Sequence, residues 1–81
     1  MEQVKDMILI IALALVDHPE QVSVNVIGKC NTIVFELTVA KSDMGKVIGK
    51  QGRIVSAIGS ILNAAAGKTG KGFLLKIVDE G

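Results

Sequence analysis

The sequence predicts an α+β fold with the element order αββααβ, and three observations support it. Apolar residues recur every three or four positions over residues 4–15 and 54–65, as they do on the buried side of helices. Every second residue is apolar over residues 22–26, 33–39 and 73–77, as in half-buried strands. Glycines interrupt the chain in its second half, and they separate a short helix from the long one that follows it.

Composition limits the class of protein. With 81 residues, 49% of them hydrophobic, and a single proline, the chain is one domain that folds, because disordered chains are poor in hydrophobic residues. The only cysteine, Cys30, cannot form an internal disulfide, and the only histidine, His18, cannot build a zinc site alone. A disulfide-stabilised secreted domain and a zinc module are therefore excluded, and we expect a cytoplasmic protein without cofactors.

Charge is distributed unevenly along the chain. The formal net charge is +1, but residues 1–40 carry −3, from two cations and five anions, and residues 41–81 carry +4, from seven cations and three anions. This asymmetry indicates an anionic partner for the second half, with a solvated basic face as the alternative. The mean hydropathy of +0.51 is high for a chain that buries only about 60% of its unfolded surface, so it predicts a partner surface.

The first helix is predicted over residues 4–15 and ends at Asp17-His18-Pro19. Its core stripe consists of Val4, Met7, Ile8, Ile11 and Leu15. The apolar run 7–16 is neither a signal peptide nor a membrane span, because the residues before it are acidic overall and a span needs about 20 apolar residues. Leu9 and Leu13 lie off the stripe, and they predict a dimer or partner face on this helix.

Two strands joined by a hairpin are expected next. The apolar positions of the two strands are Val22, Val24 and Val26, then Ile33, Phe35, Leu37 and Val39. Gly28–Asn31 joins them as a hairpin connection. Cys30 lies in that connection, and we interpret it as an incidental thiol, because the sequence shows no activating neighbour.

The second half contains two helices and a strand. Ser42 is the predicted N-cap of a short helix, with Asp43 in its first turn, where the helix dipole favours an anion. Gly49 interrupts this helix, and a longer one follows Gly52 and stops at Gly67. Gly59 inside the longer helix predicts close packing or a softened helix. The last strand carries apolar residues at Phe73, Leu75 and Ile77.

The segment between the two helices has the chemistry of a phosphate site. Glycines at 49 and 52 have no Cβ, so a polyanionic backbone can approach the peptide N–H groups closely. The helix that begins near Arg53 turns the positive end of its dipole toward the same point, and Lys46 and Lys50 add charge. Ile48 offers an apolar wall for bases. By themselves, two glycines between helices are equally typical of a tight connector.

The spacing of this segment resembles the KH motif. The residues that carry the resemblance are Ile48, Gly49, Gly52, Val55 and Ile58, in that order. Together with Val47–Arg53, Asn63–Ala66 and the length of the chain, they resemble the small bacterial KhpA family of stand-alone KH proteins. The resemblance implies a single type II KH domain over residues 1–81, with a three-stranded sheet covered on one face by three helices.

What the resemblance implies is a non-catalytic protein that binds single-stranded RNA and acts in RNA regulation, as RNA chaperones do. Its GXXG loop, residues 49–52, would clamp about four nucleotides. The implied RNA-binding residues are Lys46, Val47, Ile48, Gly49, Lys50, Gln51, Gly52, Arg53 and Val55. The apolar floor would come from Ile48, Val55 and the strand face with Leu37 and Val39. A homodimer, or a heterodimer with a larger KhpB-type protein, is the implied assembly.

Other functions are less well supported. Gly45 and Gly49 lack the spacing of a Walker A loop, and Gly70 and Gly72 are followed by Leu75 where a dinucleotide fingerprint needs its third glycine. No base lies next to a nucleophile, so we expect no enzyme activity and no small-molecule substrate. With 2% aromatic residues, the chain lacks the stacking platforms of other RNA-binding modules. The remaining alternative is a protein-interaction or dimerisation module with weak RNA contact, and changes at Lys50 and Gln51 distinguish the two.

Overall fold

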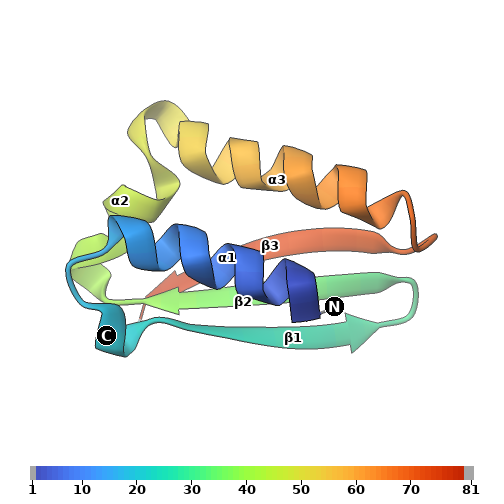
Figure 1. Cartoon of the computed structure of the whole chain (residues 1–81), viewed down its shortest axis with the longest axis horizontal. Helices are drawn as coiled ribbons and strands as arrows, with labels where there is room; N and C mark the ends of the chain where they lie inside the picture. The colour runs from blue at the N-terminus through green and yellow to red at the C-terminus, as the bar shows by residue number, and fades with distance from the viewer. Residues whose placement is uncertain (1, 80–81) are drawn as a thin grey trace.

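The computed structural model describes residues 2–79, which form three helices and a three-stranded sheet (Figure 1). The elements are α1 (Glu2–Leu15), β1 (Ser23–Lys29), β2 (Thr32–Val39), α2 (Met44–Ile48), α3 (Arg53–Ala66) and β3 (Gly72–Asp79). Short 3-10 turns lie at Pro19–Gln21, Lys41–Asp43 and Lys50–Gly52. The predicted α+β class and the order αββααβ are confirmed.

The sheet has β2 at its centre. β1 pairs antiparallel with β2, with Val26 opposite Phe35, and β3 pairs parallel with β2, with Leu75 opposite Phe35. Parallel neighbours need a long crossover connection, and here α2 and α3 supply it. The loop between these two helices lies at one end of the molecule, whereas the β1–β2 hairpin turn lies at the other (Figure 1).

The core lies between one face of the sheet and the helices. Every second residue of β2 is buried: Ile33, Phe35, Leu37 and Val39. The helices contribute Ile8 and Ala12 from α1, Val47 from α2, and Ile58 and Leu62 from α3. Phe35 and Phe73 meet edge to face, with ring centroids 5.3 Å apart. Leu74, on the other face of the sheet, is more than half exposed, so the helices cover one face.

The exposed side of α1 differs from the prediction. Leu9 packs against the core, whereas Ile10 is 67% exposed and Leu13 is 45% exposed. The buried side of α1 is centred on Ile8 and Ala12, and successive residues are rotated by about 100°. Leu9 therefore lies on the flank of the buried side, and Ile10 lies almost opposite it. The predicted exposure is thus confirmed for Leu13 and wrong for Leu9, and the partner contact itself stays a prediction.

Three local predictions are also corrected. Ser42 is not an N-cap: it lies exposed in a 3-10 turn, and the residue at the N-cap position of α2 is Asp43. Gly59 is not closely packed, since a Cβ built there would meet no atom within 4 Å. The hairpin connection is shorter than expected, because β1 continues to Lys29 and only Cys30 and Asn31 form the turn.

Candidate nucleic-acid interface

The loop between α2 and α3 has an unusual backbone. α2 ends at Gly49, whose N–H donates to the carbonyl oxygen of Gly45 at 2.9 Å. Gly49, Gln51 and Gly52 all have positive φ angles, of 81°, 58° and 73°. Glycine adopts such angles without strain, whereas Gln51 does so at a cost. The predicted interruption of the helix at residue 49 and the restart at Arg53 are confirmed.

Position 49 requires glycine because of a close contact as well as because of its φ angle. A Cβ at this position would lie 2.6 Å from Cγ1 of Ile54 and 2.9 Å from its Cβ. No real side chain fits at these distances. The main chain at Gly49 therefore packs directly on Ile54, which itself packs against the core. Gly52 has room for a Cβ, so its φ angle is the feature that requires glycine there.

Three polar side chains lie in this loop or directly after it. Lys50, Gln51 and Arg53 are all exposed. α3 begins at Arg53, whose N–H donates to the carbonyl oxygen of Lys50, and no side chain caps the helix, so the positive end of its dipole is open to an anion. Ile48 and Val55 are half-buried beside the loop. The loop thus combines bare main chain, the positive end of a helix, two cations and an apolar wall, which is an arrangement that can hold a phosphate chain with its bases.

Part of the predicted apolar floor is wrong. Leu37 and Val39 are 1% and 0% exposed, because β2 is the central strand and its inward face is covered by helices. The side chain of Val47 is likewise buried, so at most its main chain is available to a ligand. The edge strand on the side of α2 and α3 is β3, against which both helices pack. The sequence did not reveal this, because strand order is not visible in alternation.

Lys46 has carboxylate partners that the sequence did not suggest. Its Nζ contacts the carboxylate of Asp17 and lies 3.5 Å from Oδ1 of Asp43. The hydrogen bond with Asp17 raises the pKa of Lys46 above its ordinary value, against the opposing effect of desolvation, and the charge of Asp43 adds to the rise. Lys46 was predicted to bind phosphate, but the anions that it contacts in the structure are carboxylates of the protein itself.

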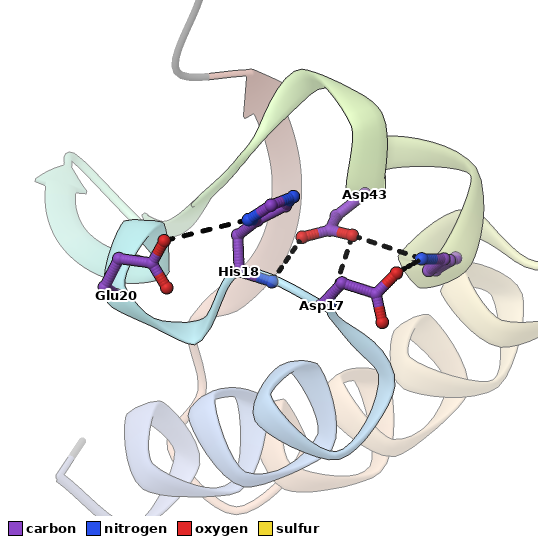
Figure 2. A network of polar contacts seen from close by, with 5 residues as sticks. Asp17, His18, Glu20 and Asp43 are labelled. Atoms are coloured by element: carbon purple, nitrogen blue, oxygen red, sulfur yellow. Dashed lines mark hydrogen bonds and ion pairs between the residues drawn. The ribbon is translucent and has the colours of Figure 1, made fainter.

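Asp43 is the centre of this network (Figure 2). Its carboxylate is fully buried and accepts hydrogen bonds from the N–H groups of Asp17 and His18, at 3.1 and 3.0 Å. Burial raises the pKa of Asp43, but these two hydrogen bonds and the charges of Lys46 and His18 outweigh it, so the pKa is lowered below its ordinary value. The carboxylate does not cap its own helix. Nothing in the sequence pointed to this tie, which spans 25 to 26 residues.

Two further basic residues lie away from the loop. Lys68 and Lys71 are exposed in the connection between α3 and β3, at the opposite end of α3 from Gly52. A groove of about 430 Å³ lies beside this connection, and Val4, Ile61, Lys68 and Phe73 are among its lining residues. Within residues 2–79, no helix is long and apolar enough to span a membrane, and no cluster of His, Cys, Asp and Glu residues could hold a metal ion.

Comparison with known proteins gives consistent matches along the chain. Residues 5–77 match the family model described as KhpA/KhpB, KH domain. The chain is 49% identical over 74 residues to the RNA-binding protein KhpA of Clostridium perfringens, which covers 91% of this chain and 99% of that protein. It is 42% identical over 76 residues to the RNA-binding protein KhpA of Chlamydia muridarum, covering 94% and 97% of the two chains.

A third relative extends the same pattern. The RNA-binding protein KhpA of Listeria monocytogenes is 41% identical over 75 residues, covering 93% of this chain and 99% of that protein. All three relatives are named RNA-binding proteins. The element order and the matched residues agree with the KH fold that the glycine spacing suggested. The chain therefore belongs to the KhpA/KhpB family of KH domains.

Proposed function

We propose that this protein is a non-catalytic KH domain that binds single-stranded RNA in the cytoplasm, with Gly49–Gly52 clamping about four nucleotides of the backbone. The curated relatives that support the proposal are named RNA-binding proteins. The observation that carries it is the packing of Gly49 on Ile54, because it leaves bare main chain beside an uncapped helix N-terminus. A simple connector between helices does not need that approach.

Each residue of the loop has a distinct role in this proposal. Gly49 and Gly52 have no side chains, so the phosphates can approach the main chain of the loop closely, and the exposed cations Lys50 and Arg53 neutralise them. The amide of Gln51 donates a further hydrogen bond. The half-buried side chains at the ends of the loop, Ile48 and Val55, are the apolar surface on which bases lie. Lys46 and Val47 contribute through the helix that carries the loop.

The decisive experiment changes the loop without touching the core. In Lys50→Asp/Gln51→Asp, two exposed side chains become anions that repel phosphate, so we expect binding of short labelled single-stranded RNA to fall at least about tenfold. Fluorescence anisotropy at several salt concentrations measures it, after circular dichroism has shown equal folding. With about three phosphate contacts, the wild type should show a log–log salt slope of roughly −2.

A matched control separates local repulsion from net charge. Lys29→Asp/Asn31→Asp makes the same change of net charge, three units, at exposed residues at the opposite end of the molecule, at the end of β1 and in the hairpin turn. We expect it to bind RNA within about twofold of the wild type, apart from a small screened effect of net charge. Equal RNA affinity of the wild type and the loop variant would contradict the clamp.

The exposed residues of α1 favour assembly as a second role. Ile10 and Leu13 are large apolar side chains on the same side of a helix, and such surface is typical of a partner contact. We propose that the protein works as a homodimer or with a larger KhpB-type KH protein, which would compensate for the low specificity of a single four-nucleotide site by avidity.

Light scattering tests this assembly directly. Ile10→Glu/Leu13→Glu should shift a dimer to monomer, whereas Leu74→Glu, an equally exposed apolar residue on the open face of the sheet, should leave the mass unchanged. A wild-type protein that stays monomeric at high concentration and gains no mass with a KhpB-type protein contradicts this second role. It leaves the RNA clamp untouched.

A further inference from the structure

We propose that Asp43 is a positioning residue for the Gly49–Gly52 loop: it fastens the short helix that carries the loop to the turn after α1, with Lys46 as its counter-ion. The consequence for RNA rests on the function proposed above. The positioning itself does not, because it concerns where the loop is held in the free protein.

The helix that leads into the loop cannot hold its own position. α2 has five residues, and isolated helices shorter than about 12 residues are marginal in water. Val47 is the side chain that it buries in the core. α1, by contrast, has 14 residues and is anchored by Ile8 and Ala12. A contact between α2 and the segment after α1 therefore fixes the position of the short helix relative to the long one.

The carboxylate of Asp43 provides that tie. Both of its oxygens accept a main-chain N–H from the segment after α1, Oδ1 from Asp17 and Oδ2 from His18. Figure 2 shows the side chain turned toward that segment. A fully buried carboxylate is costly unless it is paired and hydrogen-bonded, and here every part of that requirement is met. The contact is therefore specific in place and direction.

Lys46 completes the tie instead of serving the RNA. It lies three residues after Asp43 on the same side of α2, and it contacts both Asp43 and Asp17. A phosphate would have to compete with these two carboxylates for the same ammonium group. The exposed cations Lys50 and Arg53 carry no such partner in the part of the chain that the structure describes, so they are the better phosphate ligands.

A displacement of α2 would also displace the loop. Gly49 closes the last turn of α2 through its hydrogen bond to Gly45, and its main chain packs on Ile54 of α3. The main chain at Gly49 has little freedom to compensate, because a shift of α2 would disturb both of these contacts. Loss of the tie at Asp43 should therefore loosen the N–H groups of the loop while the sheet stays intact.

The test uses Asp43→Asn and two readouts. Hydrogen exchange followed by NMR reports on the Gly49 N–H, and the Gly72 N–H, bonded to Asn31 at 2.8 Å at the far end of the molecule, serves as an internal control. We expect exchange at Gly49 to accelerate at least about tenfold more than at Gly72, and RNA affinity to fall about tenfold, the equivalent of one hydrogen bond to a charged group. Val24→Ala, a buried change in β1, is the control for general destabilisation.

The outcome that overturns the proposal is equally concrete. If Gly49 and Gly72 accelerate by the same factor in Asp43→Asn, the residue only stabilises the fold. If the wild type binds no RNA, the proposed function fails, but the exchange comparison still decides whether Asp43 positions the loop. The two failures are therefore distinguishable.

Lys46→Met provides a second variant that changes an exposed side chain and should fold. If Lys46 is the counter-ion of Asp43, the variant should show faster exchange at Gly49 and weaker RNA binding with an unchanged salt slope. If Lys46 instead binds a phosphate, the variant should show a salt slope reduced by about 0.7 and unchanged exchange at Gly49. The second result would overturn the proposal even if Asp43→Asn does not fold.

Discussion

Two tight turns of this molecule, one at each end, hold a residue other than glycine in the left-handed region. In the hairpin turn, Cys30 has a φ angle of 47°, and in the loop between α2 and α3, Gln51 has a φ angle of 58°. Both side chains are exposed. The hairpin turn joins two strands of one sheet, whereas the loop lies between two glycines and leads into an uncapped helix.

The difference shows that an unusual φ angle alone does not make a binding site. Cys30 has neither flanking glycines nor a helix N-terminus beside it, so its strain serves only to reverse the chain. Around Gln51 the same backbone conformation combines with bare main chain at Gly49 and the exposed cations Lys50 and Arg53. The neighbours of a strained residue determine whether it can act on a ligand.

The largest effect is expected from glycine substitutions at the two ends. Gly49→Ala places a methyl group in contact with Ile54 and a Cβ on a residue with φ of 81°, so the free energy of unfolding should fall by about 2 to 4 kcal/mol and RNA binding should be lost. Gly28→Ala, beside the hairpin turn, meets nothing within 4 Å and should change stability by less than about 0.5 kcal/mol. Urea unfolding measures both, and equal midpoints would show that the loop is as tolerant as the hairpin.

An intermediate effect is expected from acid. The folded-state pKa of Asp43 is lowered, so its contribution to stability is present above its ordinary pKa of about 3.9 and is lost as the pH falls through the folded value below it. The groups that face it are Asp17, His18 and Lys46. The hairpin turn is joined to the first residue of β3 by a main-chain hydrogen bond, from the Gly72 N–H to Asn31, that does not titrate.

Hydrogen exchange below about pH 4 distinguishes the two ends. Protection at Gly49 should fall before protection at Gly72, once intrinsic exchange rates are corrected for pH. Lys46 acts at the alkaline end of the pH range, because its pKa is raised. Its contribution to stability is complete below the ordinary lysine pKa of about 10.4 and is lost as the pH rises through the raised pKa. Parallel loss of protection at both glycines in acid would contradict the role of Asp43.

The smallest effect should come from relief of strain at the two left-handed residues. Cys30→Gly and Gln51→Gly each remove a strained Cβ, and each should raise the free energy of unfolding by about 0.5 to 1 kcal/mol. Only Gln51→Gly should also weaken RNA binding, because it removes a side chain of the loop. A Cys30→Gly variant with altered RNA affinity would mean that the hairpin end belongs to the interface.

The features that sequence reasoning captured are local ones. Alternation in residues 33–39 predicted which side of β2 is buried, and the spacing of Gly49 and Gly52 predicted where α2 stops and α3 begins. Contacts between distant residues were missed, such as the hydrogen bonds of Asp43 to Asp17 and His18. Such ties depend on how elements dock, and neither periodicity nor spacing encodes that.

The errors in the predicted site have the same origin. The resemblance implied that Leu37 and Val39 line a groove, and apolar alternation could not correct this, because it looks the same in a central strand and in an edge strand. The charge of Lys46 suggested a phosphate ligand until its carboxylate neighbours were known. The sequence thus predicted which residues form the loop more reliably than which side chains near it are buried or paired with carboxylates.

The pairing of β2 has a consequence for the order in which the newly made protein folds. Thr32 pairs with Lys29, three residues before it, and with Gly72, forty residues after it. The hairpin can close early, whereas the parallel pair must wait for a long loop closure. β3 is made after both of the helices that flank the loop and that pack against it. The loop therefore acquires its final geometry only after β3 has been made, and a chain cut short before β3 would carry the two glycines without the structure that positions them.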